Sequence, residues 1–139
     1  MRISQQQART WFEQARTAHL ASADDVGRPH LVPVVFAVRA TVIVTAVDHK
    51  PKTTTNLKRL RNIASNPHVA LLVDHYEDDW SRLWWVRADG EAVLAEPGEQ
   101  PDLLAALVAK YPQYQQNPPT GTLIVTQVSR WTGWSAAEP

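Results

Sequence analysis

The sequence contains no cysteine and carries no formal net charge. The absence of cysteine excludes a disulfide framework and any metal site built on thiolates, and it fits a reducing compartment. Zero net charge argues against a dedicated nucleic-acid-binding protein, because such domains are usually basic overall. No apolar run is long enough to cross a bilayer, and the first residues lack the apolar core of a signal peptide. We therefore expect a cytoplasmic protein.

Motifs of several enzyme classes are also missing. The sequence has no Gly-x-Ser-x-Gly nucleophile elbow, no P-loop and no Gly-x-Gly-x-x-Gly segment. Five histidines are present, but no pair has the compact spacing of a zinc site. The acidic run Glu77-Asp78-Asp79 is typical of a solvated loop, because no apolar neighbours are present to shift its pKa values. We therefore assign no catalytic side chain and no metal ligand.

The pattern of apolar residues predicts a mainly β protein. With 139 residues, of which 44% are apolar, the chain is long enough for a single domain that spans residues 1–139. We expect helices at 4–17, 54–65 and 101–111. We expect about six strands, at 18–23, 30–38, 41–46, 69–73, 83–88 and 122–128. Residues 91–95 are either a continuation of the strand at 83–88 or a further strand. Strands follow strands more often than helices, which favours an antiparallel β-barrel with peripheral helices. Pro33 indicates an edge strand or a bulge.

The most unusual stretch runs from Asp48 to Arg61, between an expected strand and an expected helix. It holds five lysines and arginines and three threonines, and no acidic residue follows until Asp74. Free N–H groups and hydroxyls at a helix start, next to cations, suit a phosphate or a carboxylate. A solvated basic helix fits the same pattern, and both interpretations stay open. A nucleic-acid phosphate is a weaker choice, because the patch is short and lacks interleaved aromatic residues.

Tryptophans are concentrated in the C-terminal half of the chain. Trp84 and Trp85 are adjacent on an expected strand, so only one of them can face the inside of a barrel. Both residues can be explained as packing residues. Together with Trp80, however, they leave more aromatic surface than a small barrel can hide, and this favours a homodimer.

Four segments carry a resemblance that covers nearly the whole chain. They are Gly27-Arg-Pro-His-Leu-Val-Pro-Val34, Asp48-His-Lys-Pro-Lys52 with Asn56-Leu57, Arg61-Asn-Ile-Ala-Ser-Asn-Pro-His-Val69, and Asp79-Trp-Ser-Arg-Leu-Trp-Trp-Val-Arg87 with Gly90. In this order and spacing, the chain resembles the pyridoxamine 5'-phosphate oxidase-like class of split β-barrel flavin and deazaflavin oxidoreductases. Within that class it is most similar to the F420-dependent proteins of actinobacteria.

The resemblance implies a homodimer with two cofactor sites at the subunit interface. It implies that Pro33, Val34 and Val35 lie along the cofactor ring. The residues implied to hold the phosphate are Lys50, Lys52, Thr53 and Asn56, and those implied to approach from the partner subunit are Trp84 and Arg87. Thr53 stands where the family often has a second cation, and Lys50 is the nearby replacement. The implied cofactor is F420, with FMN as the alternative.

The resemblance also implies an activity, namely hydride transfer between reduced F420 and an unsaturated small molecule. In such proteins the cofactor carries the chemistry, and the protein orients it and excludes water. This explains the missing catalytic motifs. Two alternatives share the fold: an FMN-dependent oxidoreductase, and a protein that binds F420 or FMN without turnover.

Overall fold

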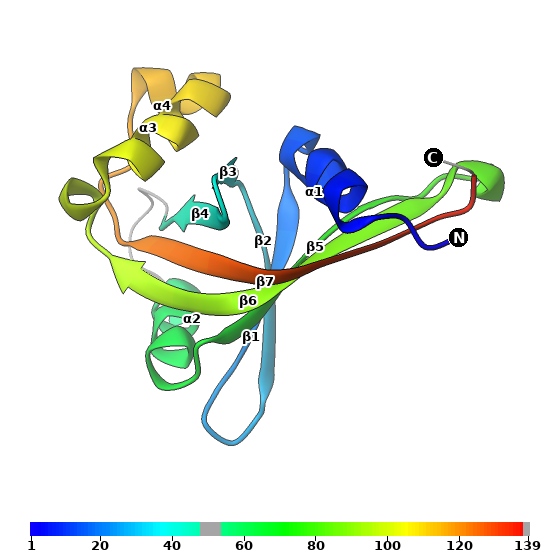
Figure 1. The fold of residues 1–139 in the computed structure, drawn as a ribbon. Coiled ribbons are helices and arrows are strands. Elements are labelled where there is room, and N and C mark those ends of the chain that lie inside the picture. The colour runs from blue at the N-terminus through cyan, green and yellow to red at the C-terminus, as the bar shows by residue number, and fades with distance from the viewer. Residues whose placement is uncertain (48–53, 138–139) are drawn as a thin grey trace.

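The computed structural model describes residues 1–47 and 54–137, and the side chains of 1–47 and 58–137. Within these ranges, one antiparallel sheet has seven strands in the order β2-β1-β5-β6-β7-β4-β3 (Figure 1). The strands are β1 (Ala18–Ala23), β2 (Pro29–Val34), β3 (Ala37–Arg39), β4 (Val42–Ala46), β5 (His68–His75), β6 (Trp84–Ala95) and β7 (Leu123–Ser135). The helices are α1 (Gln5–Gln14), α2 (Thr54–Ser65), α3 (Pro101–Lys110) and α4 (Pro112–Gln116), with short 3-10 turns η1 (Trp80–Arg82) and η2 (Pro97–Glu99).

The two edge strands of the sheet are neighbours in the sequence. β2 and β3 stand at opposite ends of the strand order, but only Val35 and Phe36 separate them in the chain. The sheet therefore curls until its two edges approach each other, and within the described residues no strand pairing joins them. This split, mainly β barrel with helices around it confirms the expected fold class. Pro33 lies on an edge strand, as expected for a residue without an N–H donor.

Helix α1 covers the main core. Ser4 caps its start, because Ser4 Oγ accepts a hydrogen bond from the backbone N–H of Gln7 at 3.1 Å. Ala8 and Phe12 lie one turn apart and are completely buried. The ring centroids of Phe12 and Phe36 are 4.7 Å apart. Burial of one such ring stabilises the fold by about 2–3 kcal/mol, so α1 helps to fix the segment between the two edge strands.

A second apolar cluster lies between α3 and the strands β3 and β4. Leu107 of α3 is completely buried there against Val44 and Leu123. The rings of Tyr111 and Tyr114 pack edge to face with their centroids 5.8 Å apart. The cluster thereby places α3, together with α4, which carries Tyr114, next to β3 and β4 (Figure 1).

Several strand boundaries differ from the sequence-based expectation. The single strand expected over 30–38 is divided into β2 and β3, because the chain leaves the sheet at Val35 and Phe36. Of the two alternatives expected for residues 91–95, the structure confirms the continuation: Gly90 lies at a bulge within one strand, and β6 extends to Ala95. The last strand does not end at residue 128 but continues to Ser135.

Two helical predictions also need correction. Helix α1 ends at Gln14 and not near Thr17, because Ala15 has an extended backbone. Pro112 ends α3 as expected but also begins the short helix α4, since its fixed φ suits the first helical position. Among the helices in the described ranges, none has the length and apolar character required to cross a membrane.

Candidate functional site

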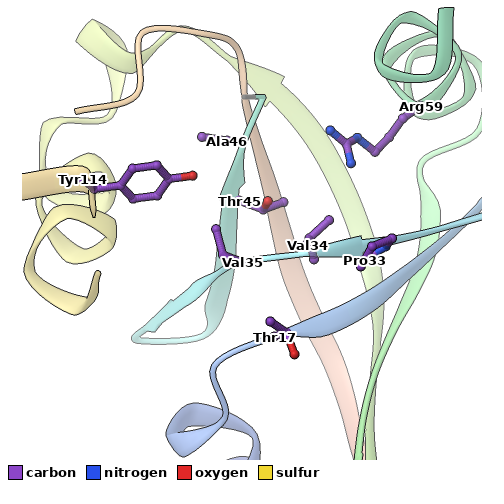
Figure 2. Close-up of a pocket in the computed structure, with 8 residues that line it drawn as sticks. All are labelled: Thr17, Pro33, Val34, Val35, Thr45, Ala46, Arg59 and Tyr114. Carbon is purple, nitrogen blue, oxygen red and sulfur yellow. The ribbon is translucent and has the colours of Figure 1, made fainter. Parts of the chain in front are cut away.

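A cavity of about 280 Å³ lies where the two edges of the sheet approach each other (Figure 2). We call it the seam cavity. Its lining comes from the end of β2 and the linker after it, the end of β4, helices α2 and α4, and the residue before β1. The lining residues are Thr17, Pro33, Val34, Val35, Thr45, Ala46, Arg59 and Tyr114.

Apolar side chains and edge backbone form much of the cavity wall. Pro33 has no N–H to offer to a neighbouring strand, and Val34 and Ala46 are both buried. Ala37 at the start of β3 pairs with Val44 of β4. Beyond this pair the two segments separate, so that Val35 and Ala46 lie on different parts of the cavity wall. The wall also carries polar side chains, from Thr17, Thr45, Arg59 and Tyr114, and concave sites that combine apolar surface with a few placed polar groups are typical of ligand and cofactor sites.

Arg59 brings a positive charge into this wall. Its exposed fraction is 7%, and it is the only buried lysine or arginine among the side chains that the structure describes. Figure 2 shows its guanidinium extending from α2 toward the cavity, with the ring of Tyr114 approaching from the opposite side. A guanidinium carries five N–H donors and a permanent positive charge. The cavity wall therefore offers a cation to a molecule with an anionic or acceptor-bearing edge.

The described part of α2 is electropositive. Burial, and then the positive charges of Lys58 and Arg59, lower the pKa of His30 below its usual value. Below the same helix, Asn62 Nδ2 donates to Ser22 Oγ at 3.3 Å, and both of these side chains are buried. The helix is thus fixed to the sheet by a polar contact, and of its described cations Arg59 lines the seam cavity.

The structure brings together one part of the predicted site. Pro33, Val34 and Val35, expected along a cofactor ring, all line the seam cavity. Asn56 lies in α2, but its side chain is outside the part that the structure describes. The three remaining residues predicted to hold a phosphate also lie outside the described residues; they are Lys50, Lys52 and Thr53.

Trp84 and Arg87 do not line the seam cavity of their own chain. The Trp84 ring packs against Trp11 of α1, with centroids 5.1 Å apart. Arg87 lies on the other face of the sheet, where its guanidinium is 5.7 Å from the Trp85 ring centroid and its Nε is 3.1 Å from Asp89 Oδ2. Trp84 and Trp85 thus point to opposite faces, as their adjacency on a strand predicts.

Sequence reasoning assigned no site role to the remaining lining residues. The sequence identified Arg59 only as one of the cations in the basic stretch from Asp48 to Arg61. The residues around Arg59 in the sequence do not distinguish it from Arg61, which is exposed. Tyr114 lies on a helix that was not expected, and Thr45 reaches the cavity only because β4 pairs with β3 and β7. Only the helical period of α2, combined with the position of the sheet, could have identified Arg59.

Comparison with known proteins gives a consistent result at the level of the family. The sequence profile of the pyridoxamine 5'-phosphate oxidase family matches residues 4–135. No curated protein sequence matches the chain.

Several solved structures share the fold at low sequence identity. A FAD-binding protein from Mesorhizobium loti has a TM-score of 0.71 and 18% identity, with 96% of this chain and 95% of that chain covered. The FAD-binding protein from Mycobacterium smegmatis has a TM-score of 0.70 and 14% identity, with 96% and 98% covered. HutZ, the heme storage protein from Vibrio cholerae, has a TM-score of 0.68 and 18% identity, with 91% and 92% covered.

Proposed function

Because the chain belongs to the pyridoxamine 5'-phosphate oxidase family, we propose that it is an oxidoreductase that transfers a hydride between reduced coenzyme F420 and an unsaturated small molecule. The observation that carries this proposal is the seam cavity, which combines the apolar stretch from Pro33 to Val35 with the buried guanidinium of Arg59. The FAD-binding proteins with the same fold support a flavin-type cofactor.

The residues of the seam cavity fit the ring of such a cofactor. Pro33 to Val35 would lie along the ring, and Arg59 would donate to an acceptor at its edge. A volume of about 280 Å³ is at the lower end of the range for ligand sites, so it accommodates a ring system and not a whole cofactor. In this proposal, the phosphate binds beyond the cavity, at the residues predicted for it: Lys50, Lys52, Thr53 and Asn56.

The protein's own contribution would be binding, orientation and exclusion of water. Bound F420 supplies a hydride, whereas bound FMN passes one or two electrons. We propose a cytoplasmic homodimer of single-domain subunits, in which Trp84 and Arg87 of the partner subunit complete the site. Tyr76, Trp80 and Trp134 are exposed large apolar residues of the kind that a second subunit would cover.

Titration of the purified protein with F420 and with FMN tests the proposal. We expect saturable binding of F420 with quenching of tryptophan emission, and weaker binding of FMN. Protein produced in a host that makes F420 should also carry its absorbance spectrum. If neither cofactor binds, the proposal is wrong, and if FMN binds more tightly, the FMN-dependent alternative replaces it.

A second candidate function is cofactor or pigment binding without turnover. The fold shared with a heme storage protein favours it. Stopped-flow mixing of the reduced, cofactor-loaded protein with quinones, nitro compounds and tetrapyrroles separates the two functions. Oxidation by any of these acceptors at a rate that exceeds the rate in buffer supports the enzyme, and none at all supports the binding protein.

A further inference from the structure

A second, larger cavity lies under the C-terminal half of α1. Its volume is about 420 Å³, which is within the range of small-molecule sites. The end of α1, the end of β5 and the start of β6 enclose it, and we call it the tryptophan cavity. The residues that decide its chemistry are Trp11, Gln14, Thr17, His75 and Trp84.

Aromatic rings form one wall of the tryptophan cavity. Trp11 and Trp84 are both partly buried, and their rings are tilted by 52° with centroids 5.1 Å apart. The His75 ring lies nearly parallel to the Trp84 ring, at 22° and 6.2 Å between centroids. A flat aromatic molecule would bury a large apolar area against these rings and gain offset or edge contacts as well.

Two charged side chains of opposite sign, Arg16 and Asp74, line the cavity, so their charges offset each other. Arg16 donates from Nη2 to the backbone oxygen of Lys110 at 3.0 Å, and its guanidinium lies 4.8 Å from the Tyr111 ring centroid. The His75 imidazole is hydrogen-bonded to the Glu77 carboxylate. The cavity also adjoins the C-terminal end of α1, which carries the negative end of the helix dipole. An anionic ligand would therefore meet the Asp74 carboxylate and an unfavourable dipole, while the Arg16 guanidinium is directed to Lys110 and Tyr111.

Polar groups without charge stand at the margin of the cavity. Gln14 and Thr17 are both exposed and both line it, so an amide and a hydroxyl are available to a ligand's polar edge. Thr17 also lines the seam cavity. A molecule in the tryptophan cavity would accordingly lie next to whatever occupies the seam cavity.

We propose that the tryptophan cavity binds a flat, uncharged heteroaromatic molecule of two or so fused rings, and that this is the class of substrate that the protein accepts. The binding part stands on the cavity alone, whereas the role as substrate rests on the proposed function. The ring packs against the Trp84 and Trp11 rings through offset or edge contacts, and its polar edge faces Gln14 and Thr17.

Isothermal titration calorimetry with quinoline, an uncharged two-ring heteroaromatic, tests the binding site. We expect saturable binding with one site per chain. Naphthalene-1-sulfonate has the same number of rings and a negative charge, and we expect it to bind about 10-fold more weakly or worse. No saturable binding of quinoline overturns the proposal, and equal binding of the sulfonate overturns the uncharged class.

A variant that fills the cavity locates the site. Gln14→Trp places an indole into the cavity from an exposed position and should weaken quinoline binding at least about 10-fold. Thr10→Trp is the matched control, because Thr10 is exposed on the same helix and does not line the cavity. Equal weakening in both variants, with unchanged melting temperatures, would contradict the assignment.

The cofactor titration separates this inference from the proposed function. F420 and FMN are titrated into the wild type and Gln14→Trp without quinoline. Loss of quinoline binding in the variant with unchanged cofactor affinity supports two distinct adjoining sites. Loss of both affinities in a folded variant shows that quinoline occupied the cofactor site, which overturns the inference. A wild type that binds quinoline but neither cofactor retains the site and loses the proposed function.

Discussion

The hydroxyl of Tyr111 bridges the backbone of Phe36. It accepts a hydrogen bond from the Phe36 N–H at 3.0 Å and lies 2.8 Å from the Phe36 carbonyl oxygen. Phe36 is completely buried in the linker between β2 and β3, where no neighbouring strand satisfies its backbone groups. The Tyr111 side chain, at the end of α3, thus provides hydrogen bonds that a neighbouring strand would otherwise provide to this backbone. Phe36 is next in the chain to Val35, which lines the seam cavity.

Removal of this hydroxyl should destabilise the fold. Tyr111→Phe removes the acceptor of the buried Phe36 N–H and the donor that the hydroxyl provides to a backbone oxygen, so we expect the free energy of unfolding to fall by about 1–3 kcal/mol. Urea denaturation measures the change. Tyr76→Phe is the matched control, since Tyr76 is 65% exposed, and it should shift stability by less than about 0.5 kcal/mol. Equal stability of the two variants would show that the bridge contributes nothing.

Arg59 should contribute to cofactor binding and Arg61 should not. Hydrogen bonds to charged groups are worth about 1.5–3 kcal/mol, so Arg59→Met should weaken F420 or FMN binding about 10-fold or more. Arg61→Met removes the same charge from an exposed position two residues away on the same helix. Fluorescence titration at constant salt compares the two. Similar losses in both variants would mean that Arg59 acts only through the net charge of the helix.

Lys50 and Lys52 are predicted to bind the phosphate, although they lie outside the described residues. Lys50→Ala and Lys52→Ala should weaken FMN binding, and the variant that loses the phosphate contact should show the larger effect, about 10-fold. Riboflavin, which lacks the phosphate, should bind both variants as it binds the wild type. Undiminished FMN affinity in both variants would refute the phosphate assignment.

The pH dependence of stability should change at Lys110. Burial, and then the charge of Arg16, lower the pKa of Lys110 from 10.5 to about 8. Between these values the unfolded chain binds more protons than the folded one, so this lysine makes stability rise from pH 8 toward pH 10.5. Burial raises the pKa of Tyr111 above 10.0, which opposes the rise at higher pH, since the unfolded tyrosine ionises first.

Thermal unfolding of the wild type and Lys110→Met at intervals from pH 7 to pH 10 checks this expectation. The difference in stability between the two proteins should grow in favour of the wild type above about pH 8. A difference that stays constant across this interval would show that the Lys110 amine is solvated in the folded protein as it is in the unfolded chain.

Gly90 should tolerate no side chain. A Cβ at this position would overlap the backbone carbonyl of Gln127 across the β6 bulge. Gly90→Ala should therefore force a backbone shift that costs about 1–3 kcal/mol in urea denaturation. Gly98→Ala is the control, because no atom lies within 4 Å of a Cβ there. If Gly90→Ala proved as stable as the wild type, the close approach of the two strands would be wrong.

The sequence allowed prediction of the elements whose cause is local. The helix that begins after residue 4, the edge position of Pro33 and the helix that ends at residue 65 all follow from interactions within a few residues. The fold class followed from strand runs that succeed one another, and the structure confirms it. Of the candidate site, the stretch from Pro33 to Val35 was predicted from the family resemblance and does line a cavity.

What remained beyond the sequence depends on distant partners. The break between β2 and β3 is stabilised by Tyr111, whose hydroxyl lies 75 residues away in sequence from the backbone that it bridges. The burial of Arg59 depends on how α2 packs on β1 and β6, and the local pattern around it does not differ from that of Arg61. The tryptophan cavity exists only because α1 ends before Ala15 and leaves space above Trp84.

The short linker between the two edge strands has a kinetic consequence. Val35 and Phe36 join β2 covalently to β3, and Tyr111 holds the linker from behind. The two edges therefore share a fixed pivot, and any widening of the seam must occur at the far end, beside α2. A ligand that enters the seam would therefore approach from that end and not past the linker.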